Sequence, residues 1–98
     1  MIESPTMETF SRLANTKFLM HFGESQSAEL ELVKVADVGS SARQIQFSLL
    51  FVGRNAPLSQ GIYRVEHDEL GTLDLFLVPI GRDQNGIQYE AIFNRMVS

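Results

Sequence analysis

The chain has no cysteine and no tryptophan among its 98 residues, and it has only three prolines. Without cysteine there can be no disulfide framework and no thiolate nucleophile, and a structural zinc site loses its usual ligands. No apolar run approaches the roughly 18 residues that a membrane-spanning helix needs. A small chain without such cross-links depends on its hydrophobic core, and 44% of the residues are hydrophobic.

Basic residues are also scarce, with eight Lys and Arg against twelve Asp and Glu and a net charge of −4. They are spread along the chain without a basic tract, which argues against a nucleic-acid partner. The opening stretch "MIESPTMETF" has acids and a proline where a signal peptide would have a basic and then an apolar region. We therefore expect a cytoplasmic protein that contacts neither nucleic acid nor a membrane.

Six short segments have the composition and the period-two alternation of β-strands, and single glycines punctuate the chain between them. They are "KFLMHF", "AELELVKVADV", "QIQFSLLFVG", "IYRVEH", "TLDLFLVPI" and "IQYEAIFNR". Such a pattern is typical of an antiparallel all-β domain. We predict one domain over residues 1–98, a six-stranded meander that forms a small, partly open barrel, with a two-layer β-sandwich as the alternative.

Three local features refine this prediction. The alternation changes phase near Leu32 and Val33, which indicates either a β-bulge or burial of both strand faces there. Pro79 is expected at a sheet edge or a bulge. The segment "GRDQNG" predicts a tight turn with Asn85-Gly86 chemistry and a positive φ angle.

A short helix is predicted over residues 5–14. Ser4 and Pro5 form an N-cap pattern, a stripe of Met7, Phe10 and Leu13 follows at helical spacing, and Asn15 can end the helix in the left-handed conformation. These are the sequence signals of a helix start and stop. Since an isolated helix of this length is marginal in water, we expect it to cover the second apolar face of residues 72–80, with Phe10 as the central contact.

The second half of the chain resembles a family of small bacterial domains of unknown function. The resemblance rests on "FSLLFVG", "PLSQGIY", "HDELG", "LFLVPIG" and "YEAIFN", in this order over residues 47–94. It implies a bacterial, stand-alone domain, with a link to phage-tail-like structural assemblies. The resemblance supplies no catalytic or binding residues.

The cluster His67-Asp68-Glu69 has two interpretations. It could hold a general base or metal ligands, or it could be the connection between two strands, with Asp68 accepting backbone N–H groups and Gly71 supplying a positive φ. Successive strand residues point to opposite faces, so three neighbours cannot readily surround one ion. We favour the turn, with a half-buried His67 satisfied by the backbone, and we expect no metal and no cofactor.

Two functions follow as alternatives. The first is a non-enzymatic structural or protein-interaction domain that meets a protein partner, or a second copy in a homodimer, through an outward apolar set: Leu50, Val52, Phe76, Val78 and Ile80. The alternative is a small-ligand-binding module that uses the barrel mouth, with Tyr63, His67 and Tyr89 as its binding residues. A hydrolase that uses His67 with Asp68 is a third possibility, but the sequence contains no complete catalytic constellation.

Overall fold

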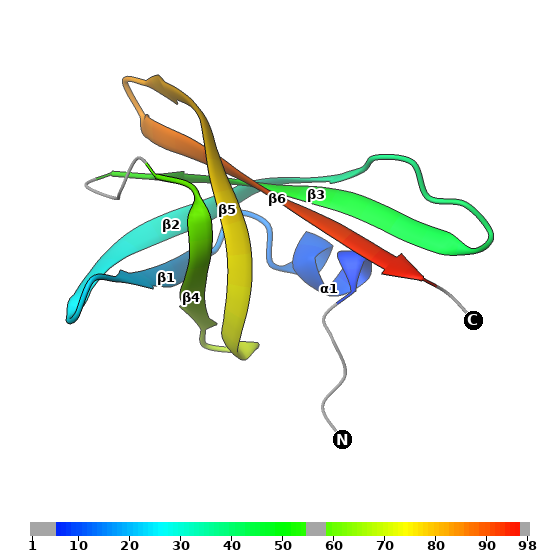
Figure 1. Ribbon diagram of the computed structural model, residues 1–98, viewed down its shortest axis with the longest axis horizontal. Coiled ribbons are helices and arrows are strands. Elements are labelled where there is room, and N and C mark those ends of the chain that lie inside the picture. Colours follow the sequence, from blue (N-terminus) through cyan, green and yellow to red (C-terminus); the bar gives the residue numbers. More distant parts are fainter. Residues whose placement is uncertain (1–5, 55–58, 97–98) are drawn as a thin grey trace.

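A computed structural model describes residues 6–54 and 59–96 of the chain. One short helix precedes six strands (Figure 1). The elements are α1 (Met7–Arg12), β1 (Lys17–Phe22), β2 (Gln26–Asp37), β3 (Gln44–Gly53), β4 (Gly61–His67), β5 (Gly71–Asp83) and β6 (Gly86–Met96). The predicted all-β class with one N-terminal helix is therefore confirmed.

The six strands are antiparallel and form a ring in the order β1-β2-β3-β6-β5-β4, with β4 returning to β1. The chain thus makes two three-stranded meanders, β1 to β3 and β4 to β6. The predicted pairing of sequence neighbours holds within each meander but not between β3 and β4, because β3 pairs with β6 instead. The ring is closed between β1 and β4 by three residue pairs, Leu19–Glu66, Met20–Val65 and His21–Arg64.

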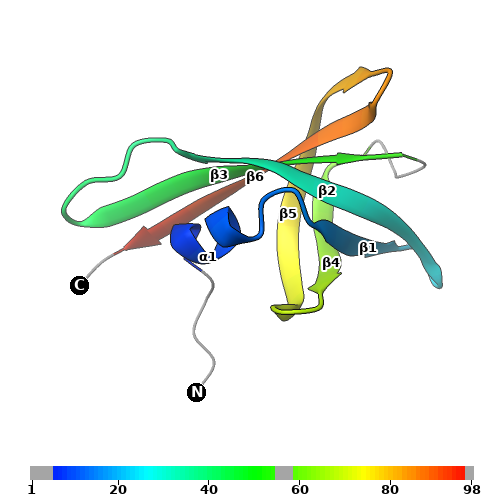
Figure 2. The ribbon, with the colours of Figure 1, turned by 180° about the vertical axis from the view of Figure 1, so that it is seen from behind.

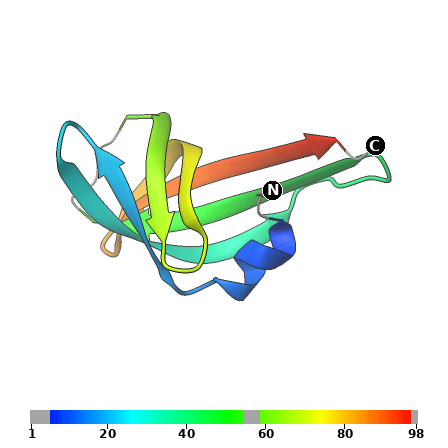
Figure 3. The same cartoon turned by 90° about the horizontal axis from the view of Figure 1, so that it is seen from below.

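The long strands each bridge two neighbours in turn. β5 pairs with β4 over residues 71–77 and with β6 over residues 78–83. β2 likewise pairs first with β1 and then, through its second half, with β3. As a result β3 and β6 extend together past β5, away from the β4–β5 hairpin (Figures 1 and 3). Among the residues that the structure describes, no strand lies opposite the inner face of this extension.

The core consists of the inward-facing residues of the strands, which alternate with outward-facing ones along β6. Ile87, Tyr89 and Ala91 are buried, while the alternate side chains of β6 face outward. Both predicted irregularities are present as register shifts, one between Leu32 and Lys34 and the other between Pro79 and Gly81. The bulge in β2 explains the change of phase, since one extra residue turns the following side chains over.

Helix α1 begins later than the sequence pattern predicts. Its N-cap is Thr6, whose Oγ1 accepts a hydrogen bond from the backbone N–H of Thr9 at 3.2 Å. The predicted cap at Ser4 and Pro5 lies outside the described residues. The helix ends at Arg12, two residues before the predicted end at residue 14. Asn15 has the predicted left-handed conformation, with a φ of 68°, and its N–H donates to the carbonyl of Leu32 at 2.6 Å.

The helix packs at a different place from the one predicted. Phe10 is fully buried, and its ring lies 6.0 Å from that of Phe47 on β3 and 5.3 Å from that of Phe93 on β6. The helix runs beside β2, beneath the extension of β3 and β6 (Figure 2). The prediction that it covers residues 72–80 is wrong. The stacked aromatic rings of the extension have no opposing sheet, and so they are the surface that the helix covers.

The hairpin between β5 and β6 also differs from the predicted turn. Asp83 pairs with Gly86, so the two turn residues are Gln84 and Asn85 rather than Asn85 and Gly86. Gly86 is the first residue of β6, and it has the positive φ, at 137°. The glycine is required here for a second reason as well, because a Cβ at this position would lie 2.5 Å from the carbonyl oxygen of Gly53.

Candidate functional site

His67 is held by a chain of hydrogen bonds that leaves neither ring nitrogen open. The backbone N–H of Glu69 donates to Nδ1 at 3.0 Å, so the neutral ring carries its proton on Nε2. Nε2 lies 2.9 Å from Oγ1 of Thr16. The Thr16 hydroxyl in turn donates to the carbonyl oxygen of Leu13 at 2.6 Å. The ring also packs against Phe18, with 4.5 Å between the ring centres.

This network gives His67 a structural role. It ties the turn between β4 and β5 to the end of α1, 51 residues away in sequence. The cluster of three polar residues is a connection between strands, as predicted, and Gly71 has a positive φ of 78°. The acceptor in that turn is His67 Nδ1, however, and not the side chain of Asp68. The His67 side chain lies over the turn, so that its Nδ1 and not a side-chain oxygen of Asp68 accepts the N–H of Glu69.

His21 does not join His67. It lies on the outer face of β1, where Nε2 pairs with the carboxylate of Glu66 on β4, whereas His67 belongs to the inner face. Among the described residues there is no group of three or more His, Asp or Glu side chains placed to hold a metal ion.

The two tyrosines of the predicted ligand site lie on inner faces of the barrel. The Tyr63 hydroxyl donates to the carbonyl oxygen of Ser59 at 2.6 Å. Tyr89 is fully buried in the core. His67 lines a hollow of about 300 Å³ together with Phe18 and Asp68, and neither tyrosine lines it. The three residues are thus not gathered around this hollow, and the ligand site stays a prediction.

Because Tyr89 is buried, the free energy of unfolding should vary with pH in the alkaline range. Burial, and then the neighbouring Tyr63, raises the pKa of Tyr89 from 10.0 to about 12. A raised pKa stabilises the fold below pH 10, and this stabilisation is lost as the pH rises towards 12. At ~1.36 kcal/mol per pKa unit, the loss is roughly 2–3 kcal/mol. Urea unfolding between pH 9 and pH 12 should show this loss of free energy of unfolding in the wild type and not in Tyr89→Phe.

If the free energy of unfolding had the same pH profile in the two proteins, the assignment of this loss to Tyr89 would be contradicted.

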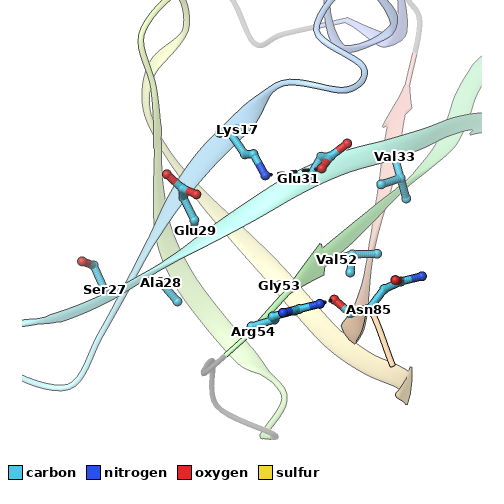
Figure 4. Close-up of a pocket in the computed structure, with 10 residues that line it drawn as sticks. All are labelled: Lys17, Ser27, Ala28, Glu29, Glu31, Val33, Val52, Gly53, Arg54 and Asn85. Atoms are coloured by element: carbon cyan, nitrogen blue, oxygen red, sulfur yellow. Dashed lines mark hydrogen bonds and ion pairs between the residues drawn. The ribbon is translucent and has the colours of Figure 1, made fainter. Parts of the chain in front are cut away.

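A larger hollow, of about 740 Å³, lies beside β2 and extends to the tip of the β5–β6 hairpin (Figure 4). Its two basic side chains, Lys17 and Arg54, are both bound to other groups of the protein. Lys17 Nζ lies 3.4 Å from Glu31 Oε1. Arg54 donates to the carbonyl oxygens of Asn85 at 3.2 Å and Gln84 at 3.4 Å. Because both basic side chains already bind groups of the protein itself, neither is available in this arrangement to bind an anionic ligand.

The outer face of β4 and β5 carries an exposed apolar pair. Ile62 and Phe76 are directly opposite in the register, so their side chains lie side by side. Ile62 is 73% exposed and Phe76 is 52% exposed. The next outward pair along the hairpin is ionic, with Arg64 Nε 3.6 Å from Asp74 Oδ1. The outer face of this hairpin therefore places an exposed apolar pair next to an ion pair.

Of the predicted interface residues, Phe76 and Ile80 are the two with large exposed side chains, each 52% exposed. Leu50, Val52 and Val78 are half-buried on outward faces, and Val52 lines the 740 Å³ hollow. The predicted set omits Ile62 and Ile92, although both have outward parity. The outward position of Ile62 follows directly from its alternation with the inward-facing Tyr63. Ile92 follows from the same rule applied between Ala91 and Phe93.

Comparison with models of protein families gives a match. A family described as "Domain of unknown function (DUF6916)" matches residues 5–93. Searches of curated proteins and of solved structures give no significant match. Within the described residues, no helix has the length and apolar character needed to cross a membrane. The family match extends over nearly the whole chain, and the protein belongs to the DUF6916 family of domains of unknown function.

Proposed function

We propose that this chain is a non-enzymatic protein-interaction domain of the cytoplasm that docks onto another protein through the outer face of β4 and β5. The observation that carries the proposal is the exposed cross-strand pair of Ile62 and Phe76. The link of the resembling bacterial domains to phage-tail-like assemblies supports a place in a larger structural complex.

Energetics support docking at this pair. Full burial of an Ile or Phe side chain contributes about 1.5–3 kcal/mol. Since Ile62 and Phe76 retain more than half of their exposure, covering both would contribute roughly 2–4 kcal/mol to binding. That is enough for a pair of central anchor residues in an interface. Arg64 and Asp74, one pair further along the hairpin, give the partner polar groups that fix its orientation.

The polar groups in the interior favour this proposal over catalysis. His67, the one inward-facing histidine in the described residues, is engaged on both ring nitrogens by Glu69 and Thr16. A general base needs an open nitrogen within hydrogen-bond reach of a substrate proton. Because both nitrogens of His67 already have structural partners, we place the binding function on the outer surface, where Ile62 and Phe76 are exposed.

Photo-crosslinking in the native cell tests the docking surface. A photoreactive phenylalanine analogue at position 76 should form an adduct with a different protein, because the probe then lies in the centre of the proposed contact. The same probe at position 72, on the outer face of the same strand, serves as the matched control and should give little of that adduct.

The substitution Ile62→Ser in the probe-bearing chain should abolish the adduct at position 76. An adduct equally strong from positions 72 and 76, or one formed only between copies of this chain, would contradict docking of another protein through the Ile62–Phe76 pair.

A further inference from the structure

The second half of β6 has an open edge. β6 pairs with β3 from Ile87 to Met96, but it pairs with β5 only from Gly86 to Glu90. Beyond Glu90, no strand in the described part of the chain lies on the β5 side. Figure 3 shows this half of β6 continuing past β5, with β3 between it and the side where α1 and β2 lie. Residues 91–96 therefore form an edge of roughly 20 Å, at ~3.3 Å per residue.

The backbone groups at this edge can be assigned from the ladder. Val38 N–H donates to the carbonyl oxygen of Gln46, so the backbone groups of Gln46 face β2. Backbone groups of successive residues point to opposite sides of a strand, and those of Phe47 therefore face β6. Phe47 is opposite Phe93 in a register without shifts. The groups of Phe93 thus bond to β3, and those of Ile92 and Asn94 point to the open side.

We infer that a second copy of this chain pairs through this edge, strand β6 against strand β6, in an antiparallel arrangement about a two-fold axis. The inference rests on the proposed role as an interaction domain, and it names a second contact of that domain. An open edge presents alternating donors and acceptors that another strand satisfies. Two identical antiparallel edges are self-complementary, so the pairing closes as a dimer.

Charge favours a second copy as the occupant. The described side chains that border this edge on the outer face are uncharged: Ile92 and Asn94 on β6, and Gln44, Gln46 and Ser48 on β3. On the outer face, these residues therefore bring no like charges together when two copies of a chain with a net charge of −4 approach. Another open edge, β5 over residues 71–77, has Asp74 at its centre, and pairing two copies there would bring two such carboxylates close together, each with its Arg64 partner.

The exposure of Ile92 also favours pairing of this edge with a second copy. Ile92 is 57% exposed on the outer face beside the edge, and a paired strand would cover part of it. Edge strands that avoid pairing usually carry proline, lysine or a bulge. Residues 91–96 have no proline and no lysine, with Arg95 as their single charged residue, and the β3–β6 register runs through them without a shift.

Proline at position 94 provides the test. Asn94 N–H points to the open side, so Asn94→Pro removes a donor that only the second copy would use. Proline is tolerated at such an edge position. The matched control is Asn94→Ala, which loses the same side-chain contact with Gln44 but keeps the N–H. In sedimentation equilibrium, wild type and Asn94→Ala should show twice the chain mass of 11.0 kDa, and Asn94→Pro should show the single mass.

A second variant tests the same inference in case the proline variant does not fold. Ile92→Lys leaves the backbone ladder intact and places a charge beside the edge, and it should also be monomeric with a melting temperature close to that of the wild type. A monomeric wild type at every concentration up to its solubility limit would overturn the inference while leaving the proposed docking surface in place. A dimer that survives Asn94→Pro and Ile92→Lys, or that is lost in Ile62→Ser instead, would also overturn it.

Discussion

Replacing Phe10 by alanine is expected to lower the free energy of unfolding by about 3–5 kcal/mol. The side chain is fully buried between α1 and the aromatic rings of Phe47 and Phe93. These two rings are themselves stacked, with 4.8 Å between their centres. Removing Phe10 leaves a cavity at the place where the helix closes the inner face of the sheet extension. Since a small domain has only ~5–15 kcal/mol of stability, most of it should be lost.

Phe76→Ala is the matched control for this experiment, because it makes the same chemical change on the outer face. Phe76 is about half exposed, and its truncation should change stability by about 0.5 kcal/mol or slightly more. Urea unfolding of both variants measures the difference. Similar losses in the two variants would contradict the assignment of Phe10 to the core and of Phe76 to the docking surface.

Gly86→Val is expected to cost about 2–5 kcal/mol, from two separate causes. The φ of 137° is strained for a residue with a Cβ, and most strained for a β-branched one. A Cβ there would also lie 2.5 Å from the carbonyl oxygen of Gly53, which is backbone and cannot rotate away. The substitution should therefore push the β5–β6 hairpin away from the end of β3.

Gly71→Val separates the two causes. Gly71 also has a positive φ, of 78°, but a Cβ at this position would meet no other atom within 4 Å. It should cost only the backbone strain, about 1–3 kcal/mol. Thermal unfolding of both variants would show the larger loss for Gly86→Val. An equal loss would mean that the contact between Gly86 and Gly53 does not constrain the barrel.

The strands and most of the core could be predicted because alternation is a local signal. Each inward residue of β6, such as Tyr89, can be identified from its immediate neighbours, and the bulge in β2 appears as a change of phase. The pairing of β3 with β6 could not be predicted, since it depends on contacts between segments about 40 residues apart in sequence. The docking of α1 follows from that pairing, which creates the uncovered aromatic surface that Phe10 fills.

The site predictions divide in the same way. That His67 lies in a turn follows from sequence, but its bond to Thr16 joins residues 51 positions apart and leaves no local trace. The exposed outer face of residues 76–80 was expected to lie under the helix. Its exposure follows only once the helix is seen to pack on the opposite side of the sheet. Ile62, its partner across the hairpin, could have been found by applying parity to both strands together.

The most direct test of the central claim, that this domain works by binding another protein through its outer face, is its native size in an extract of the organism that encodes it. A tagged wild-type chain should elute from gel filtration in a complex well above twice its mass of 11.0 kDa. The double variant Ile62→Ser, Phe76→Ser should elute at the size of its own dimer, with an unchanged melting temperature. Wild type and variant eluting together at the size of the isolated protein would contradict the claim.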